Sequence, residues 1–199
     1  MPAPALARLT YADYLALEST SEVRHEYYEG QVFAMAGGSG AHARLKTNLA
    51  GLLFGALRGR PSSVRDVDQR VRVPSTGLAT YPDLSVVCGA REPDADDPHA
   101  LTNPTLLAEV LSPTTAAYDR GQKFDQSQQL PTLRQYLLLD SERRHVDLYT
   151  RLDDGRWARA GYAAGAVPLE SIGVVIDLDE VYAGWEEERA IDAGPGTKA

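Results

Sequence analysis

YPDLSVVC at residues 81–88 and NPTLLAEVLSP at residues 103–113 are the stretches that decide the fold of this chain. Each contains a short apolar run bounded by Pro, Gly or Ser-Pro, a pattern typical of strands in the middle of a sheet. Each run also contains one acidic residue, Asp83 in the first and Glu109 in the second. The two stretches therefore predict central strands that bring carboxylates into the protein.

Two helices and a hairpin are predicted on the N-terminal side of these strands. Leucines recur at helical spacing in residues 41–59, and residues 9–22 have the pattern of a shorter amphipathic helix with Thr10 as its N-cap. The segment EYYEGQVFAM at 26–35 predicts two short strands joined by a turn at Glu29-Gly30.

The remaining segments predict further strands, one helix and an exposed loop. Residues 62–74 alternate Val with charged residues and predict one half-buried strand. The Asp- and Pro-rich residues 91–104 predict an exposed loop, and they lack the Gly and distal Glu of a calcium-binding EF-hand. The other expected elements are a loop at 75–80, a helix at 114–130, strands at 133–142 and 144–152, a hairpin at 153–163, and a last strand or helical turn at 173–189.

One domain is the simplest organisation for a chain of 199 residues with this pattern. No period of roughly 20 to 50 residues repeats itself, and no internal linker divides the sequence. We expect one α/β or α+β domain over residues 1–185, followed by a flexible C-terminal tail at residues 186–199.

Composition favours a folded protein of the reducing cytoplasm. Hydrophobic residues make up 43% and charged residues 24% of the chain, close to the averages for globular proteins. No apolar run approaches the roughly 18 residues of a membrane span, and the start of the chain lacks the pattern of a secretion signal. The single cysteine, Cys88, has no partner for a disulfide or a thiolate metal site, and we expect it to be a small core residue.

The net charge of -8 counts against a sequence-independent nucleic-acid binder, because such proteins neutralise phosphates with Lys and Arg. An active site built from carboxylates is itself acidic, however, and bound divalent cations would invert its local charge. Five arginines lie close together and offer a hypothetical phosphate-contacting face: Arg58, Arg60, Arg65, Arg70 and Arg72.

Nucleophilic and phosphate-loop chemistries find no support in the sequence. There is no G-x-S-x-G elbow, and Cys88 lies in an apolar strand instead of an exposed, electropositive setting. GGSG at 37–40 lacks the Lys-Ser/Thr pair that begins the helix of a phosphate loop.

Asp83 and Glu109 are the strongest candidates for a chemical site. Burying an unpaired carboxylate costs several kcal/mol, so such a pair needs hydrogen bonds, cationic partners or a metal. Two oxygen donors on neighbouring strands suit Mg²⁺ or Mn²⁺, since water and substrate phosphate complete the coordination of these ions. The residues alone leave a structural alternative open, in which Asp83 ends a turn after Pro82 and Glu109 pairs with an Arg.

An ordered series of motifs supports the first interpretation. Over residues 8–183 the chain resembles the Uma-two family of restriction-endonuclease-like proteins, a branch of the PD-(D/E)XK nuclease superfamily. The motifs are a Leu-Thr-Tyr-x-x-Tyr helix at 9–14, HEYYEG at 25–30, AHARL at 41–45, YPDLSVV at 81–87, NPTLLAEVLSPTT at 103–115, DRGQKF at 119–124 and RQYLLLD at 134–140.

The resemblance implies a mixed central sheet flanked by helices, with Asp83 and Glu109 on adjacent strands as catalytic metal ligands. Glu26 matches an early acidic position of the family, and it either binds the metal directly or orients a ligating water. In the superfamily a Lys two residues after the second acid polarises the attacking water, and this chain has Leu111 at that position. The resemblance implies that Lys123, in the following helix, reaches the same space instead.

Lys123 also has a structural interpretation, because it stands four residues after Asp119 and the two would form a surface ion pair on one helix face. As a catalytic group, its ammonium would stabilise charge that develops on the attacking oxygen and on phosphorus. His42 and Tyr136 belong to matching segments and are expected to have supporting roles.

The function implied by the resemblance is that of a divalent-metal-dependent endonuclease, a hydrolase that cuts DNA phosphodiester bonds with Mg²⁺ or Mn²⁺ as cofactor. A catalytically inactive, nuclease-fold domain for binding or assembly is the alternative hypothesis, motivated by Leu111 and the acidic charge. An enzyme acting on RNA or on a small phosphorylated compound is a third. We expect no membrane partner, and a homodimer would suit an enzyme that cuts two strands.

Overall fold

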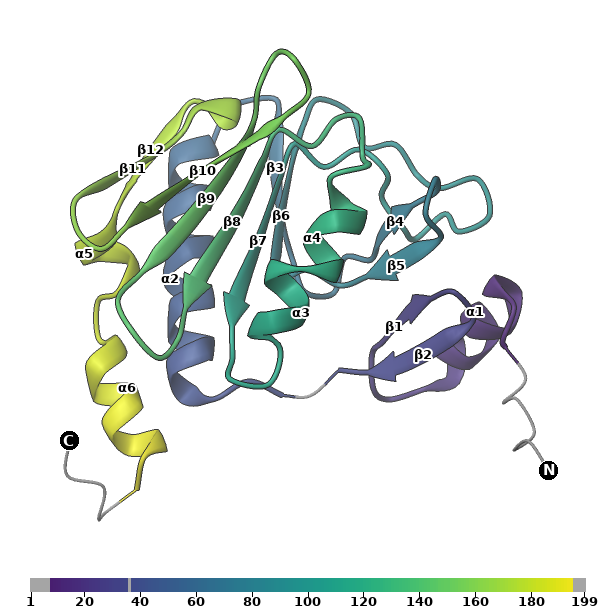
Figure 1. Ribbon diagram of the computed structural model, residues 1–199, viewed down its shortest axis with the longest axis horizontal. Helices are drawn as coiled ribbons and strands as arrows, with labels where there is room; N and C mark the ends of the chain where they lie inside the picture. Colours follow the sequence, from purple (N-terminus) through teal and green to yellow (C-terminus); the bar gives the residue numbers. More distant parts are fainter. Residues whose placement is uncertain (1–7, 36, 195–199) are drawn as a thin grey trace.

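A mixed six-stranded sheet forms the centre of the computed structural model, which describes residues 8–35 and 37–194 (Figure 1). Its strand order is β10-β9-β8-β7-β6-β3, in which β7 and β8 are parallel and the other neighbours are antiparallel. The strands are β3 (Ser62–Asp66), β6 (Leu84–Cys88), β7 (Leu106–Leu111), β8 (Gln135–Asp140), β9 (Val146–Arg151) and β10 (Trp157–Tyr162).

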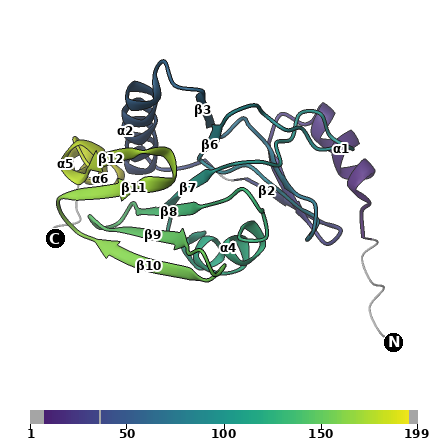
Figure 2. The same cartoon turned by 90° about the horizontal axis from the view of Figure 1, so that it is seen from above.

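Helices cover both faces of this sheet, as Figure 2 shows from above. Helix α2 (Gly40–Leu57) packs on one face, together with the C-terminal elements, and the short helices α3 (Ala116–Arg120) and α4 (Gln122–Ser127) lie on the other. The C-terminal elements are β11 (Ala166–Leu169), a 3-10 turn (Glu170–Ile172), β12 (Val174–Asp177), α5 (Leu178–Val181) and α6 (Trp185–Asp192).

The side-chain period of two in the central strands separates two apolar cores. From β7, Leu106, Ala108 and Val110 face the core under α2, where every fourth residue from Leu45 to Leu57 is buried. Leu107 and Leu111 face the opposite core, which contains Phe124 and Tyr136. Glu109 lies between Leu107 and Leu111 in the sequence, so its side chain belongs to the α3–α4 side of the sheet.

A second, antiparallel sheet lies beside the first, with the order β2-β1-β5-β4. The hairpin β1–β2 turns at Glu29 and Gly30, whose φ values of 49° and 83° are those of a tight turn between antiparallel strands. Helix α1 packs on this sheet, and its N-terminus is closed by reciprocal hydrogen bonds between Thr10 and Asp13. The elements are α1 (Tyr11–Thr20), β1 (His25–Tyr28), β2 (Gln31–Ala34), β4 (Val71–Val73) and β5 (Leu78–Thr80).

The central strands, the hairpin and the two N-terminal helices confirm the predicted pattern, whereas residues 62–80 correct it. The single strand expected at 62–74 is two strands in different sheets, β3 and β4, separated by a turn in which Gln69 N–H donates to the Asp66 carbonyl at 3.0 Å. The loop expected at 75–80 contains β5, which pairs with β4 and β1. Strands of three residues are too short to show a period.

The helix expected at 114–130 is interrupted at Gly121, which separates α3 from α4. The Cβ of any other residue at position 121 would lie 3.1 Å from the Ala117 carbonyl oxygen.

Cys88 is another correction, because it is exposed at the end of β6 and is not a core residue.

The C-terminal boundary expected at residue 185 falls inside α6, so residues 186–192 are helical and are not a flexible tail. The carboxylate of Asp192 accepts hydrogen bonds from the N–H groups of Gly40 and Ala41 at 3.0 and 2.9 Å, which caps the N-terminus of α2. The tail expected at 195–199 lies outside the described residues. No helix in residues 8–35 and 37–194 is long and apolar enough to cross a membrane.

Candidate active site

Asp83 and Glu109 stand opposite each other at the edge of the paired strands β6 and β7. The antiparallel register pairs Leu84 with Ala108, so the next step along the ladder brings Asp83 to Glu109. The Asp83 N–H donates to Glu109 Oε2 at 3.3 Å, and the Val110 N–H donates to Asp83 Oδ2 at 2.8 Å. Backbone groups of each strand therefore hold the carboxylate of the other.

Both carboxylates are buried, with 9% of Asp83 and 4% of Glu109 exposed. Burial raises the pKa of Glu109 well above its ordinary value; Lys123 opposes this shift, while Asp119 and Asp83 add to it. Burial also acts on Asp83, but the contact with His42 and the Val110 N–H lower the pKa of that carboxyl below its usual range. The surroundings therefore favour the ionised form of Asp83 and the protonated form of Glu109, so Glu109 needs a nearby cation more than Asp83 does in order to ionise.

Lys123 supplies one such cation from α4. Its Nζ lies 2.9 Å from Glu109 Oε1, 2.9 Å from Glu26 Oε1 and 3.8 Å from Asp119 Oδ1. The side chain is only 5% exposed, and the neighbouring carboxylates raise the pKa of Lys123 well above its ordinary value despite burial. The expected i, i+4 ion pair with Asp119 is present, but both partners are buried, so its expected place on the surface is wrong.

Glu26, on β1, is the second carboxylate within 2.9 Å of the Lys123 ammonium. Its Oε1 also accepts a short hydrogen bond from the Thr80 hydroxyl of β5, and its Oε2 accepts one from the Tyr118 hydroxyl of α3 at 3.0 Å. Burial opposes ionisation, but Lys123 and these hydroxyls lower the pKa of Glu26 below its usual range. Two of these partners share Oε1, so the direct metal contact considered from the sequence would fall to Oε2 of Glu26.

Helix α2 brings two basic side chains to Asp83. His42 Nε2 lies 3.3 Å from Asp83 Oδ2, and Lys46 Nζ lies 3.8 Å from Asp83 Oδ1. The two residues are four positions apart and so lie on the same helix face. His42 thus takes the supporting position expected of it, while Lys46 was not anticipated.

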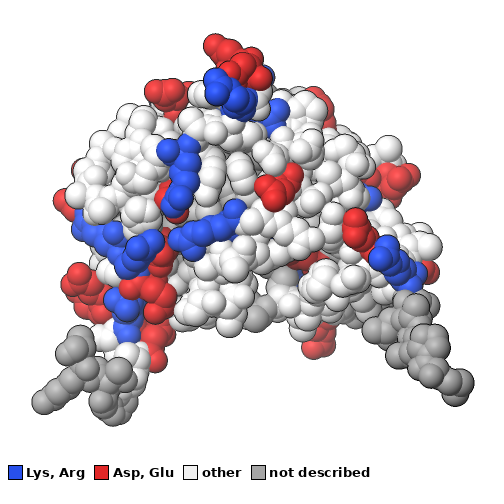
Figure 3. Space-filling view, in the orientation of Figure 1, with Lys and Arg blue, Asp and Glu red and all other residues white. Residues whose placement is uncertain are grey.

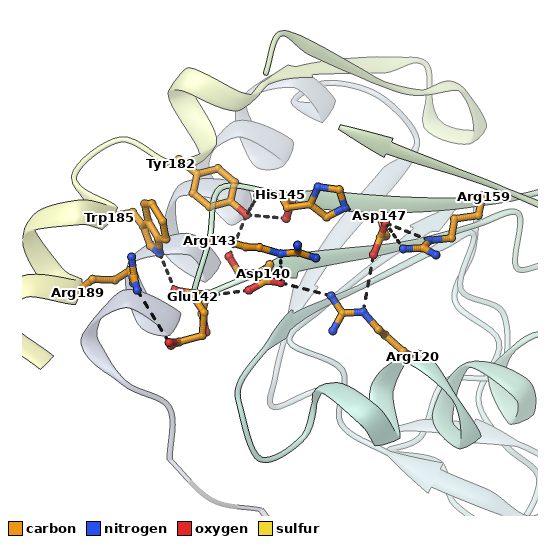
Figure 4. Close-up of polar contacts among 11 residues, drawn as sticks. Arg120, Asp140, Glu142, Arg143, His145, Asp147, Arg159, Tyr182, Trp185 and Arg189 are labelled. Carbon is orange, nitrogen blue, oxygen red and sulfur yellow. Dashed lines mark hydrogen bonds and ion pairs between the residues drawn. The ribbon is translucent and has the colours of Figure 1, made fainter. Parts of the chain in front are cut away.

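Arg120, the last residue of α3, joins this helix to the sheet through ion pairs (Figure 4). Its guanidinium lies 3.4 Å from Asp140 Oδ2 on β8 and 3.7 Å from Asp147 Oδ2 on β9. Asp147 is itself held by Arg159 and His145 at 2.8 and 3.1 Å. This network holds α3 against the sheet, and the same helix carries Tyr118 and Asp119, which line the site.

A cavity of about 630 Å³ joins these side chains into one site. Its lining includes four carboxylates, from Glu26, Asp83, Glu109 and Asp119, and the cationic side chains of Arg24, Lys46 and Lys123. Tyr136 packs behind it, where its hydroxyl donates to the Asp119 carbonyl at 3.4 Å. The structure therefore brings together Glu26, Asp83, Glu109 and Lys123 from four segments that are far apart in the sequence.

The Asp83–Glu109 pair fits a hard divalent cation. The buried acids outnumber the one buried ammonium beside them, and a divalent ion would lower the pKa of Glu109 by direct attraction. Mg²⁺ commonly takes one or two protein carboxylates and completes its shell with water and substrate oxygens. Within residues 8–35 and 37–194, no three His, Cys, Asp or Glu side chains are grouped so as to hold a metal by themselves.

Thr80, Tyr118 and Lys46 are the site residues that sequence reasoning missed. Thr80 lies in the three-residue strand β5, whose pattern is too short to detect, and Tyr118 lies in the helix broken at Gly121. Lys46 could have been found from its spacing of four residues from His42. Leu111 is buried in the core beside Phe124 and Tyr136, so the site receives its lysine from α4 and none from β7.

The sheet, its flanking helices and the acidic cavity define a protein with a nuclease-like fold. The same fold is seen in a crystal structure described as "a putative nuclease belonging to DUF820" from Anabaena variabilis. The two structures superpose with a TM-score of 0.73 at 17% sequence identity, over 89% of this chain and 98% of that one.

The chain belongs to the Uma2 family, described as "Putative restriction endonuclease", which it matches over residues 11–186. It is 37% identical to the uncharacterized protein slr1290 of Synechocystis sp. over 184 residues, covering 92% of this chain and 96% of that protein. It is 36% identical to the uncharacterized protein sll1609 of the same organism over 151 residues, covering 75% and 84% of the two chains. The expected family and fold class are thereby confirmed.

Proposed function

We propose that this protein is a divalent-metal-dependent endonuclease that hydrolyses phosphodiester bonds of DNA. The observation that carries the proposal is the buried Asp83–Glu109 pair with the Lys123 ammonium 2.9 Å from Glu109, all within one cavity. Membership of a family described as "Putative restriction endonuclease" supports DNA as the substrate.

Asp83 and Glu109 are the proposed ligands of Mg²⁺ or Mn²⁺. When bound, such an ion supplies Lewis-acid polarisation of a phosphoryl oxygen and lowers the pKa of water. His42 and the Val110 N–H hold Asp83 in place, at 3.3 and 2.8 Å from its Oδ2. The other oxygen, Asp83 Oδ1, forms an ion pair with Lys46 at 3.8 Å.

Lys123 is the proposed electrostatic catalyst. Its ammonium lies beside Glu109 and is held by Glu26, so it is oriented before substrate arrives. A fixed positive charge stabilises the negative charge that develops on the attacking oxygen and on the phosphoryl group. Arg24 and Lys46 also line the cavity and are the proposed contacts for the phosphates next to the bond that breaks.

Cleavage assays with Glu109→Gln and Lys123→Met test these roles. Each variant should lose DNA cleavage in Mn²⁺ by on the order of 100-fold or more, because each loses a charge that acts in the transition state. Asp97→Asn is the matched control, since Asp97 is buried and ion-paired to Arg70 at 3.0 Å but does not line the cavity. Cleavage by Glu109→Gln at the wild-type rate would overturn the assignment.

A binding or assembly domain without catalysis is the second candidate, favoured by the net charge of -8 and by Leu111 in place of the usual lysine. Titration with Mn²⁺ in a thermal unfolding assay separates the two, because a metal that binds the native state stabilises it by mass action. The nuclease should be stabilised, and Glu109→Gln should lose the effect. If Mn²⁺ hardly changes the unfolding temperature of either wild type or Glu109→Gln, and wild type does not cleave DNA, the binding domain is favoured.

A further inference from the structure

Phe33 is an exposed aromatic residue on the hairpin that carries Glu26. In the antiparallel register of β1 and β2, Phe33 is the direct partner of Glu26, so both side chains stand on the same face of the hairpin. Phe33 is nevertheless 49% exposed, whereas Glu26 is buried against Lys123. A half-exposed aromatic residue therefore stands next to the acid that positions Lys123.

The same ring lines the cavity that contains Asp83 and Glu109. The direct partner of Tyr28 is Gln31, two residues before Phe33, so Tyr28 lies diagonally across the hairpin from Phe33. Tyr28 lines the cavity too. Met35 and Val67 add further apolar surface. The cavity lining thus combines apolar with charged side chains. The cavity volume of about 630 Å³ lies in the range of pockets that bind small organic groups.

We propose that this cavity takes an unstacked nucleobase of single-stranded DNA, stacked on Phe33, and thereby presents the adjoining phosphodiester to Asp83 and Glu109. The inference rests on the proposed function and deepens it by naming the strand state of the substrate. Aromatic rings bind single strands in this way because every base has a flat π-face, so the contact needs no particular sequence.

The charge of the protein supports the same choice. Affinity for a continuous duplex comes largely from cations that neutralise its phosphates, and this chain carries a net charge of -8. Bases in a duplex are stacked on each other, and extruding one costs free energy that a single strand does not have to supply. Base stacking on Phe33 gives the protein a source of affinity that does not depend on net charge.

Phe54 provides a matched control within the chain. It lies on α2, is 66% exposed, and does not line the cavity. Solitary exposed apolar residues of this kind are common on protein surfaces. Phe33 differs from it in standing beside Glu26 inside the candidate site.

The test compares wild type, Phe33→Ala, Phe33→Trp and Phe54→Ala on a single-stranded oligonucleotide and on the duplex of the same sequence. Affinity is measured by fluorescence anisotropy in EDTA, and cleavage is measured in Mn²⁺. Wild type should prefer the single strand in both assays. Phe33→Ala should lose roughly 5- to 150-fold in single-strand affinity, the range for removing one stacking ring, while Phe33→Trp and Phe54→Ala retain it.

The two assays separate failure of the inference from failure of the proposed function. Cleavage of both substrates with equal efficiency, unchanged in Phe33→Ala, would overturn the stacking role and leave the nuclease standing. Single-strand binding that is lost in Phe33→Ala, without cleavage by wild type, would support the stacking role and contradict the nuclease. Thermal unfolding of each variant shows whether it is folded. Retained single-strand affinity in Phe33→Trp would show that binding depends on an aromatic ring at this position.

Discussion

Lys123 is the residue on which the charge balance of the site depends. Its side chain is 5% exposed and its ammonium lies within 4 Å of Glu26, Glu109 and Asp119, so it offsets three buried acids at once. Removing one partner from a buried ion pair leaves the other charge uncompensated. We predict that Lys123→Met loses about 3–5 kcal/mol of unfolding free energy at pH 7, measured by urea denaturation.

The loss in Lys123→Met should depend on pH. The folded-state pKa of Glu26 lies below its ordinary value of 4.5, so the stability it contributes is present above that pH and is lost as pH falls through the folded value. The folded-state pKa of Lys123 lies above its ordinary value of 10.5, so its contribution is present below that pH and is lost at higher pH. The difference from wild type should therefore be largest between about 4.5 and 10.5 and should shrink in acid. A difference that grows in acid would contradict the pairing of Lys123 with Glu26.

The hairpin β1–β2 is the element that brings both Glu26 and Phe33 to the cavity, and its turn depends on Gly30. The φ of Gly30 is 83°, and a Cβ at this position would lie 2.5 Å from the Arg8 Cβ. L-residues with a side chain pay about 1–2 kcal/mol in this conformation. We predict that Gly30→Ala destabilises the protein by at least this amount and also lowers DNA cleavage, because it disturbs the strand that holds Glu26.

Gly155, in the turn between β9 and β10, is the control for Gly30. Its φ is also 83°, and a Cβ there would meet nothing within 4 Å. Gly155→Ala should lose a similar conformational contribution to stability, measured by the same urea denaturation, while cleavage stays at the wild-type level. Equal losses of cleavage in both variants would show that the hairpin has no special part in the site.

Elements with a long period, an apolar run or a clear turn signal could be predicted from the sequence, whereas the short strands β4 and β5 could not. Helix α2 has 18 residues and carries leucines at helical spacing from Leu45 to Leu57, and the β1–β2 turn has the Glu-Gly signal. Strands β4 and β5 have three residues each, too few to show a period; they pair with each other, and β5 also pairs with the distant β1. The break falls at Gly121, a residue of low helix propensity, but a single glycine is tolerated within many helices and so did not divide the predicted helix.

The same distinction applies to the candidate site. Asp83 and Glu109 stand out in the sequence because each is a charge within an apolar run, whereas Lys123 was singled out through the family resemblance. Its approach to Glu109 depends on how α4 packs against the sheet. Thr80 and Tyr118 contact Glu26 from segments 54 and 92 residues away, and no local pattern identifies such contacts.

The charge distribution of the whole molecule limits how it can hold DNA. On the face shown in Figure 3, basic side chains gather over β8 and β9. Several of the arginines between 58 and 72 have internal partners: Arg70 pairs with Asp97, Arg72 lies over the Tyr11 ring, and Arg60 donates to carbonyls of Ile172 and Gly173. That segment is therefore engaged in large part in holding the fold together.

Phosphate binding should accordingly be limited to a few cations at the cavity, such as Arg24 and Lys46. A single strand releases about 0.7 counterion per neutralised phosphate, so a plot of log affinity against log salt should have a slope of roughly -1 to -2. The slope is measured by anisotropy titrations at several salt concentrations. A slope steeper than roughly -4 would show that basic surface outside the cavity contributes most of the binding.

The most direct test of the nuclease site is the cleavage of single-stranded and duplex DNA in Mn²⁺ by wild type, Asp83→Asn and Asp97→Asn, purified identically. Asp83 and Asp97 are both buried and ion-paired, but only Asp83 lines the cavity with Glu109 and Lys123. We predict Mn²⁺-dependent cleavage by wild type and Asp97→Asn and its loss in Asp83→Asn. Cleavage by Asp83→Asn at the wild-type rate, or none by correctly folded wild type, would contradict the account.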